Sequence, residues 1–259
     1  MYKLGFIGMG NMASALMNGF INSGAVKADE ICGSDISTAC QNNAKTRGVS
    51  VMADNHATVK NADIIFIAVK PQVLEQVVAE IRGDLKGKAV VSIALGYSFD
   101  RYEELLDQST RHLTIMPNTP AEVGEGMTIV EDVHTLTEEE YKDVMVLLES
   151  IGSVQVLSPG LMGVGGALSG CGPAYIYMII EGLADGAVKN GLPRAAAYKM
   201  ASQTVLGAAK MQLESGMHPG ILKDNVTSPA GSTIRGVKAL EDHGVRSAMI
   251  DAIDKACGN

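Results

Sequence analysis

The sequence predicts an α/β domain with a doubly wound parallel sheet over residues 1–158, followed by an all-helical domain over residues 159–259. Apolar runs of strand length alternate with helical patterns through the first part, and no convincing strand signal follows Pro159. The run Asp63–Val69 (DIIFIAV) is rich in β-branched residues, as is typical of a strand buried on both faces of a parallel sheet. At 259 residues, the chain has room for two domains of ordinary size.

The elements of the first domain follow from its apolar periodicity. Short apolar runs predict strands at Lys3–Ile7, Glu30–Ser34, Asp63–Val69, Lys88–Leu95, Arg111–Met116, Gly126–Val130 and Ser153–Leu157. Helical spacing predicts helices at Asn11–Ser23, Val73–Ile81 and Glu138–Ser150. This alternation indicates parallel strands joined by crossover helices.

The second domain is predicted to contain four helices. Pro173 begins one that ends at Asn190–Gly191, Pro193 begins one that ends at Ser215–Gly216, and two more span Ser232–Asp242 and Val245–Ala256. Proline in the first turn and glycine after the last are ordinary helix boundaries. Broad apolar faces with few charges favour burial against another subunit, although the same faces could pack on the α/β domain.

Composition excludes several classes of protein. A net charge of −8 argues against a nucleic-acid partner, which requires clustered Lys and Arg. The four cysteines are scattered and no HxxxH pattern occurs, so we expect neither a disulfide framework nor a metal site. The apolar N-terminal run is too short for a signal peptide, and no stretch was expected to approach a membrane span. A cytoplasmic protein without a membrane partner is the expectation.

The segment Gly8-Met9-Gly10-Asn11-Met12-Ala13 matches GxGxxA, directly after a strand and at the start of a helix. The first glycine permits a tight turn, the second lets the backbone approach a pyrophosphate, and Ala13 packs the helix on the strand. Free N–H groups and the helix dipole favour phosphates at this point. In this context the pattern predicts a Rossmann dinucleotide-binding domain.

The residues after the second strand give a mixed signal about the cofactor. Asp35 could accept from the ribose 2′-hydroxyl of NAD and repel a 2′-phosphate, or it could cap the next helix. Ser34, Ser37 and Thr38 could instead donate to the phosphate of NADP, although no Arg lies beside them. NADP(H) and NAD(H) therefore both remain open.

One further segment, Lys223–Thr233 (KDNVTSPAGST), has no apolar periodicity and leads directly into a helix. Its concentration of Asn, Ser, Thr, Pro and Gly suits it to hydrogen-bonding a small polar ligand rather than to forming a core. A Lys-Pro pair at Lys70–Pro71 follows a central strand, where α/β sheets bind ligands, and favours a cofactor contact.

Five motifs in this order make the chain resemble the pyrroline-5-carboxylate reductase family: the fingerprint, Ala68–Gln72 (AVKPQ), Met116–Pro120 (MPNTP), Ser169–Tyr175 (SGCGPAY) and Lys223–Thr233. The resemblance covers essentially the full length, and the last motif is specific to the family. It implies reduction of a cyclic imine to L-proline with NAD(P)H, and helical domains that interlock as a dimer, often assembled into a decamer. Cys171 stands where the family commonly has Ser, and Gly163 and Gly166 stand where it has Asp and Thr.

The resemblance also implies roles for individual residues. The cofactor would be lined by Ile7, Gly8, Met9, Gly10, Asn11, Met12, Ser34, Asn55, Ala68, Val69, Lys70, Pro71 and Asn118. The substrate would be contacted by Asn225, Ser232 and Thr233, with Ser169, Gly170 and Gly172 close by.

The chemistry of the substrate explains why these residues suit it. A carboxylate is well held at a helix start, and both Ser169–Pro173 and Gly231–Thr233 are expected to open helices. Hydride attack is aided when the imine nitrogen has a hydrogen-bond partner, and Thr233 is the predicted catalytic contact, with a helix cap as its alternative role. No His, Lys or carboxylate lies in an acid–base arrangement in these motifs, so positioning is expected to supply much of the rate.

Two other functions compete with this hypothesis. A β-hydroxyacid dehydrogenase shares the two-domain plan, but the helix that begins at Pro173 lacks the lysine which those enzymes use. A dinucleotide-sensing protein without catalysis is the alternative from another class, and the intact polar residues at 225–233 argue against it.

Overall fold

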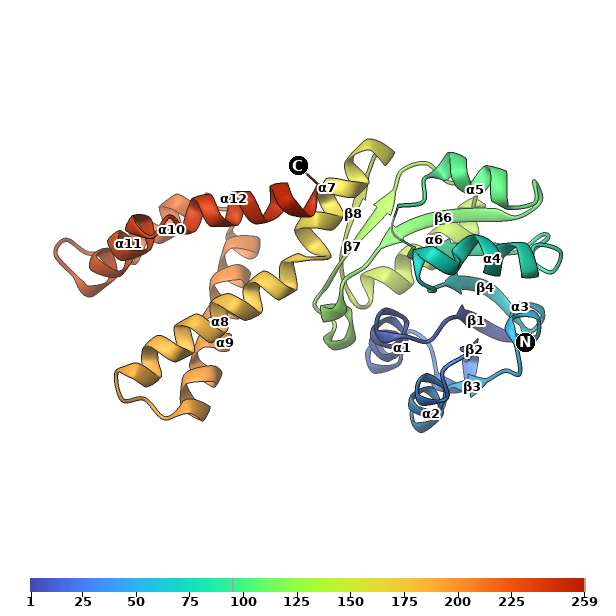
Figure 1. Ribbon diagram of the computed structural model, residues 1–259, viewed down its shortest axis with the longest axis horizontal. Helices are drawn as coiled ribbons and strands as arrows, with labels where there is room; N and C mark the ends of the chain where they lie inside the picture. The colour runs from blue at the N-terminus through green and yellow to red at the C-terminus, as the bar shows by residue number, and fades with distance from the viewer. Residues whose placement is uncertain (95, 259) are drawn as a thin grey trace. The chain divides into compact units, whose positions relative to one another are not determined.

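The computed structural model describes residues 1–94 and 96–258, which form two compact units, Met1–Cys171 and Gly172 onward (Figure 1). The division falls after Cys171 rather than at 158. The predicted boundary and the observed division differ because helix α7 (Pro159–Ser169) packs on strands β7 and β8 and therefore belongs to the same compact unit as the sheet.

The first unit is built on one eight-stranded sheet in the order β3-β2-β1-β4-β5-β6-β7-β8. The strands are β1 (Tyr2–Ile7), β2 (Ile31–Ser34), β3 (Ser50–Val51), β4 (Ala62–Ile67), β5 (Ala89–Ser92), β6 (Arg111–Met116), β7 (Gly126–Glu131) and β8 (Gly152–Leu157). The strand order reverses between β1 and β4, so the sheet has the topological switch point at which Rossmann folds bind dinucleotides. Seven strands were predicted and are present; β3, with two residues, was too short to leave a pattern. Leu95, predicted to end the fifth strand run, lies outside the described residues.

Helices cover both faces of the sheet. They are α1 (Asn11–Ser23), α2 (Thr38–Thr46), α3 (Asn55–Asn61), α4 (Pro71–Ile81), α5 (Phe99–Leu105), α6 (Glu138–Glu149) and α7 (Pro159–Ser169), with short 3-10 turns η1 (Ala28–Glu30) and η2 (Thr119–Val123). One apolar core contains side chains of α1 and α6, whereas a second contains side chains of α3, α4 and α5. The predicted doubly wound arrangement is therefore confirmed.

The last two strands depart from a fully parallel sheet. Strand β7 runs antiparallel to β6, with Ile115 opposite Val130, and β8 is parallel to β7. The connection between β6 and β7 contains only η2, and a connection this short cannot cross over to make a parallel pair. Helix α6 provides the crossover between β7 and β8.

The second unit is helical throughout the part that the structure describes. Its helices are α8 (Gly172–Lys189), α9 (Arg194–Ser215), α10 (Pro219–Asn225), α11 (Ser232–Asp242) and α12 (Val245–Ala256). The four predicted helices lie within two residues of their expected bounds. The helices that were missed in either unit are short or lack an apolar stripe: α2, α3, α5, α7 and α10.

The core of the second unit is small. Among the residues that the structure describes there, the buried apolar side chains are three alanines where α8 and α9 meet, Ala184, Ala197 and Ala201. Large apolar side chains such as Met178, Met211 and Leu213 are exposed. A unit of this size is not stabilised by so little buried surface, so these faces require a further covering.

One expectation about membranes was wrong. The run Pro159–Lys189 is long and apolar enough to cross a membrane by length and composition, and only 11% of its most apolar window is buried. The sequence pattern missed it because glycines and the charged residues Glu181, Asp185 and Lys189 interrupt the apolar stretch, which also has a break at Gly170–Cys171.

Candidate active site

The carboxyl ends of three neighbouring strands bring the predicted cofactor residues together. Ile7 is paired with Ser34 on one side and with Ile67 on the other, so Gly8, Asp35 and Ala68 follow at the same edge of the sheet. This edge flanks the topological switch point.

Gly8 makes the tight turn that joins β1 to α1. Its φ is +89°, and a Cβ there would lie 2.8 Å from the carbonyl oxygen of Ala68 and 3.1 Å from Val69 Cγ1. Its N–H donates to the carbonyl of Ser34 at 2.8 Å, and the N–H of Ala68 donates to Ile7 at 2.8 Å. Glycine is thus required both by the backbone conformation and by the close approach of β4.

Gly10 begins α1 and leaves its N-terminus open. Its φ of −68° suits any residue, and a Cβ there would meet nothing within 4 Å. No side chain caps the helix, so the first N–H groups of α1, at Asn11 and Met12, have no partner within the helix. Open space above Gly10 beside free N–H groups is what a pyrophosphate needs.

Asp35 holds the glycine-rich turn from the side of β2. One carboxylate oxygen accepts from the N–H of Met9 at 2.6 Å, and the other accepts from the N–H of Ser37 at 2.7 Å. Ser37, rather than Asp35, caps α2, because its hydroxyl accepts from Cys40. Of the two roles considered for Asp35, capping the next helix is therefore excluded.

Ser34 and Asn55 form a pair beside this turn. The buried hydroxyl of Ser34 donates to the side-chain oxygen of Asn55 at 2.7 Å. The amide nitrogen of Asn55 lies 3.4 Å from Glu80. Two residues predicted to line the cofactor are thus in contact with each other, Ser34 at the end of β2 and Asn55 at the start of α3.

Lys70 and Pro71 begin α4 after the end of β4. Lys70 is the extended N-cap residue with an exposed side chain, Pro71 occupies the first turn, and its carbonyl accepts from the hydroxyl of Tyr97 at 3.1 Å. In the described part of the chain Lys70 forms no ion pair. Its ammonium is therefore available to an anionic ligand at this edge.

Asn118 ties the end of β6 to α7. Its side-chain nitrogen donates to the carbonyl of Ser169 at 3.0 Å, and its oxygen accepts from the N–H of Met127 at 2.9 Å. Asn118 is buried, so the structure shows it first as a link between these elements. The segment Ser169–Pro173 opens a helix as expected, because α8 begins at Gly172. Ser169 itself is the last residue of α7, and Gly170 and Cys171 lie in the break between the two helices.

Close packing explains two of the glycines that distinguish α7. A Cβ at Gly166 would lie 1.9 Å from Met116 Sδ, and one at Gly165 would lie 2.6 Å from Ile129 Cδ1. Helix α7 therefore lies so close to β6 and β7 that an added methyl at either glycine would require the end of the Met116 or Ile129 side chain to move. At Gly163, in contrast, a Cβ would meet nothing within 4 Å.

Three of the predicted substrate residues, Asn225, Ser232 and Thr233, lie in the second unit at the ends of two helices. Asn225 is the last residue of α10, and Ser232 and Thr233 are the first two of α11. All three are exposed. The N-cap of α11 is Gly231 and no side chain caps this helix, so the alternative role of Thr233 as a cap is wrong.

The loop between α10 and α11 is held by hydrogen bonds to two of its backbone carbonyls. Ala230 has φ +57°, a left-handed conformation that favours glycine, and its carbonyl accepts from Arg235 at 2.8 Å. The N–H of Gly231 donates to Ser228 at 3.1 Å. This turn leaves the first N–H groups of α11 free for a ligand.

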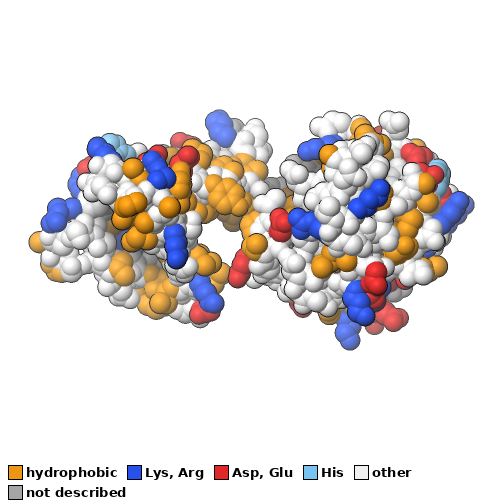
Figure 2. All heavy atoms as spheres, turned by 90° about the horizontal axis from the view of Figure 1, so that it is seen from below, with side chains coloured by type: hydrophobic (Ala, Val, Ile, Leu, Met, Phe, Trp, Pro, Cys, Tyr) orange, Lys and Arg blue, Asp and Glu red, His pale blue; other side chains and the backbone are white. Residues whose placement is uncertain are grey.

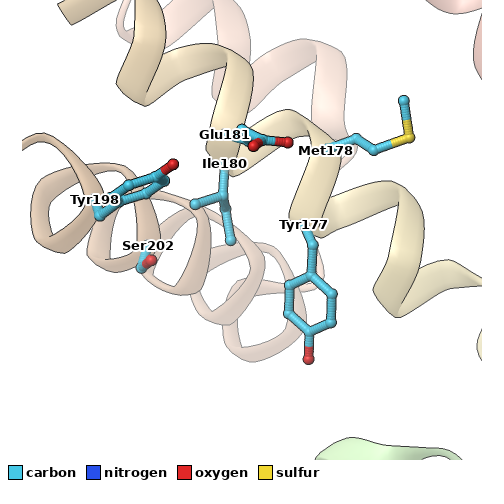
Figure 3. A pocket seen from close by; sticks show the side chains of 6 residues that line it. All are labelled: Tyr177, Met178, Ile180, Glu181, Tyr198 and Ser202. Carbon is cyan, nitrogen blue, oxygen red and sulfur yellow. The ribbon is translucent and has the colours of Figure 1, made fainter. Parts of the chain in front are cut away.

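A groove of about 430 Å³ lies between α8 and α9 within the second unit. Figure 3 shows Ile180 and Glu181 on α8 and Tyr198 and Ser202 on α9 along it, together with Tyr177 and Met178. In Figure 2, hydrophobic side chains gather on the visible face of the helical unit. The groove is lined mostly by apolar and aromatic side chains and, among its described lining residues, presents no convergent set of catalytic groups.

Cys32 lies within β2, two residues before the strand ends. Burial raises the pKa of the Cys32 thiol to about 11, so this cysteine is a neutral core residue. Among the described residues, no three His, Cys, Asp or Glu side chains come close enough to hold a metal ion.

The residues of the first unit fit a dinucleotide. The tight turn at Gly8, the open space above Gly10 and the uncapped start of α1 together form a cradle for two phosphates. A nicotinamide dinucleotide held there would supply the hydride for reduction of a substrate. Fold and site define a dinucleotide-dependent oxidoreductase with a separate helical unit.

Comparison with known proteins specifies the family. A family model for pyrroline-5-carboxylate reductase dimerisation matches residues 159–259, and one for NADP oxidoreductase, coenzyme F420-dependent, matches residues 3–96. The pyrroline-5-carboxylate reductase of Methanosarcina acetivorans is 42% identical over 256 residues, which cover 98% of this chain and 95% of the relative. The Escherichia coli protein of the same name is also 42% identical, over 258 residues, with the same coverage.

A solved structure agrees over the same length. Plasmodium falciparum pyrroline carboxylate reductase with NADP bound has a TM-score of 0.90 at 33% identity, covering 99% of this chain and 96% of that one. The chain belongs to the pyrroline-5-carboxylate reductase family. It is an NAD(P)H-dependent oxidoreductase, and the resemblance found in its sequence motifs is confirmed.

Proposed function

We propose that this chain reduces the C=N bond of 1-pyrroline-5-carboxylate with NAD(P)H, giving L-proline in the last step of proline biosynthesis. Relatives of that name at about 40% identity over nearly the whole chain support the reaction. The observation that carries the cofactor half is the cradle at Gly8 and Gly10, whose shape suits a pyrophosphate.

The start of α11 is the proposed substrate site. The free N–H groups there suit the carboxylate of the substrate, since the N-terminus of a helix favours negative charge. The Thr233 hydroxyl makes no hydrogen bond with any other described residue, so it is available to the imine nitrogen. Asn225, at the end of α10, and Ser232 are proposed to contact the substrate beside it, with Ser169, Gly170 and Gly172 as further contacts.

On this proposal, the protein aids the reaction mainly by positioning. Thr233 orients the imine nitrogen and stabilises its protonated form through one hydrogen bond, while the helix N-terminus fixes the carboxylate. The cofactor is bound by residues 1–158, at Ile7–Met12, Ser34, Asn55, Ala68–Pro71 and Asn118, and residues 159–259 form the dimerisation and substrate domain.

The exposed apolar faces of α8 and α9 support self-association. The dimerisation-domain match covers these helices, and their three-alanine core is too small to stabilise the unit alone. We propose that a partner subunit, rather than a membrane, covers the apolar run Pro159–Lys189. We further propose that dimers assemble into a decamer and that the protein is cytoplasmic. We also propose that it has no nucleic-acid partner, which the net charge of −8 supports.

The proposal is tested by measuring reductase activity with NADH and with NADPH, as the loss of reduced nicotinamide after 1-pyrroline-5-carboxylate is added. Absence of turnover with both cofactors would refute it. Thr233→Ala is expected to lower kcat by at least about a hundredfold, because a hydrogen bond to the reacting nitrogen is lost. The affinity for NAD(P)H should stay within about twofold of wild type, given that Thr233 contacts only the substrate.

Thr233→Ser is the matched control, since it keeps the hydroxyl and removes only a methyl group. It should retain most of the activity. If cofactor affinity falls as far as kcat in Thr233→Ala, then Thr233 has a structural role instead.

A further inference from the structure

The position of Asp35 brings a carboxylate to the place where the adenosine ribose of a bound dinucleotide would lie. Asp35 is the first residue after β2, and its contact with the N–H of Met9 fixes it against the glycine-rich turn. In Rossmann folds an acidic residue at this strand end accepts from the ribose 2′-hydroxyl.

Two backbone hydrogen bonds fix the orientation of the Asp35 carboxylate but occupy only some of its acceptor positions. Each of its oxygens accepts one backbone N–H, from Met9 and from Ser37, and each oxygen of an ionised carboxylate can accept two hydrogen bonds. The side chain is partly exposed, so the remaining acceptor positions are accessible to a ligand. Asp35 can therefore hold the turn and accept a ribose hydroxyl at the same time.

The groups that could bind a 2′-phosphate are fewer than the sequence pattern suggested. The Ser34 hydroxyl donates to Asn55, and the Ser37 hydroxyl caps α2 at Cys40. Two hydroxyls remain as donors: Thr38, exposed at the start of α2, and Ser37, which only accepts in its bond with Cys40 and keeps its O–H.

Among the described residues, no Lys, Arg or His side chain forms an ion pair with Asp35. The sequence from Ile31 to Ala44 contains no Lys or Arg. The basic residues that follow are at the far end of α2, where Arg47 lies 3.6 Å from Glu122. A phosphate placed beside Asp35 would thus meet a like charge without an ion-pair partner.

We propose that Asp35 determines the cofactor specificity of this chain and favours NADH over NADPH. The inference rests on the proposed use of a nicotinamide dinucleotide, and it adds the residue and the direction of the preference. A relative that holds NADP shows that the family fold accepts the phosphorylated cofactor, so the choice here depends on the side chains after β2.

The test measures binding of each reduced cofactor by nicotinamide fluorescence, without substrate, and then kcat/KM for each cofactor. Wild type is expected to bind NADH at least about tenfold more tightly than NADPH, from the repulsion between two close charges in a partly exposed site. Asp35→Asn should reduce this ratio by about tenfold or more, and adding Ile36→Arg, at a fully exposed neighbour, should reverse it.

Asp29→Asn is the matched control, because Asp29 is exposed in the turn η1 just before the same strand and the substitution changes the net charge equally. It should leave the ratio unchanged. A wild-type preference for NADPH would overturn the proposal, as would an equal loss of affinity for both cofactors in Asp35→Asn, which would make Asp35 a structural residue only. Because binding is measured without pyrroline-5-carboxylate, failure of the reductase assay leaves this test intact.

Discussion

Gly8 and Gly10 lie two residues apart in one turn, and replacing each with alanine should affect different properties. At Gly8, an alanine would have to adopt φ +89° and place its Cβ 2.8 Å from the Ala68 oxygen. The left-handed backbone costs about 1 kcal/mol, and forcing atoms into the packed contact with β4 costs about 1–3 kcal/mol. Gly8→Ala should therefore lower the free energy of unfolding by about 2–4 kcal/mol.

Gly10→Ala should leave stability within about 1 kcal/mol of wild type, because its φ of −68° is ordinary and nothing lies within 4 Å of the added methyl. That methyl would instead occupy the space through which a pyrophosphate reaches the start of α1. We expect the Kd for reduced nicotinamide cofactor to rise by at least about tenfold, equivalent to about 1.4 kcal/mol.

Two measurements separate these effects: urea unfolding followed by circular dichroism at one protein concentration, and titration of cofactor fluorescence. The expected pattern is an early urea midpoint for Gly8→Ala and a normal midpoint with weak binding for Gly10→Ala. Wild-type cofactor affinity in Gly10→Ala would refute the assignment of the cradle, and a wild-type midpoint in Gly8→Ala would refute the clash.

Three further predictions concern stability. Ala230→Gly should raise the urea midpoint, since relief of the left-handed backbone exceeds the added entropy of the unfolded chain by about 0.5–1 kcal/mol; an unchanged or lower midpoint would contradict this. Gly163→Ala, in open space on α7, should stabilise by up to about 1 kcal/mol. Gly166→Ala should give less stabilisation than Gly163→Ala or a net loss, because the end of the Met116 side chain must move to admit the methyl group. Equal shifts in urea unfolding would argue against close packing of α7. Burial raises the pKa of Glu131, so its protonated form favours the fold below the unfolded pKa of about 4.3, and stability is lost as pH rises through the raised folded value. Glu131→Gln should therefore raise Tm at pH 8 and have little effect near pH 4; a Tm difference independent of pH would disprove the ionisation argument.

Much of the fold follows from local patterns. The β-branched run at Asp63–Val69 became the central strand β4, and GxGxxA identified both the β1–α1 turn and its ligand class. Such features depend on residues close in sequence, whose periodicity and backbone preferences survive without knowledge of the fold. Short helices such as α2 and α10 escaped detection because seven to nine residues give too little periodicity.

The sequence by itself determined the alternation of strands and helices, the glycine turn and the order of the family motifs. Tertiary structure decided how distant residues use their side chains: Asp35 holds Met9, Ser34 donates to Asn55, and Asn118 links β7 to α7. It also shows that Thr233 does not cap α11 and that Ala230 adopts a left-handed backbone conformation. The physical reason is that a hydrogen bond or a close contact between residues far apart in the chain depends on three-dimensional position, which local periodicity does not encode.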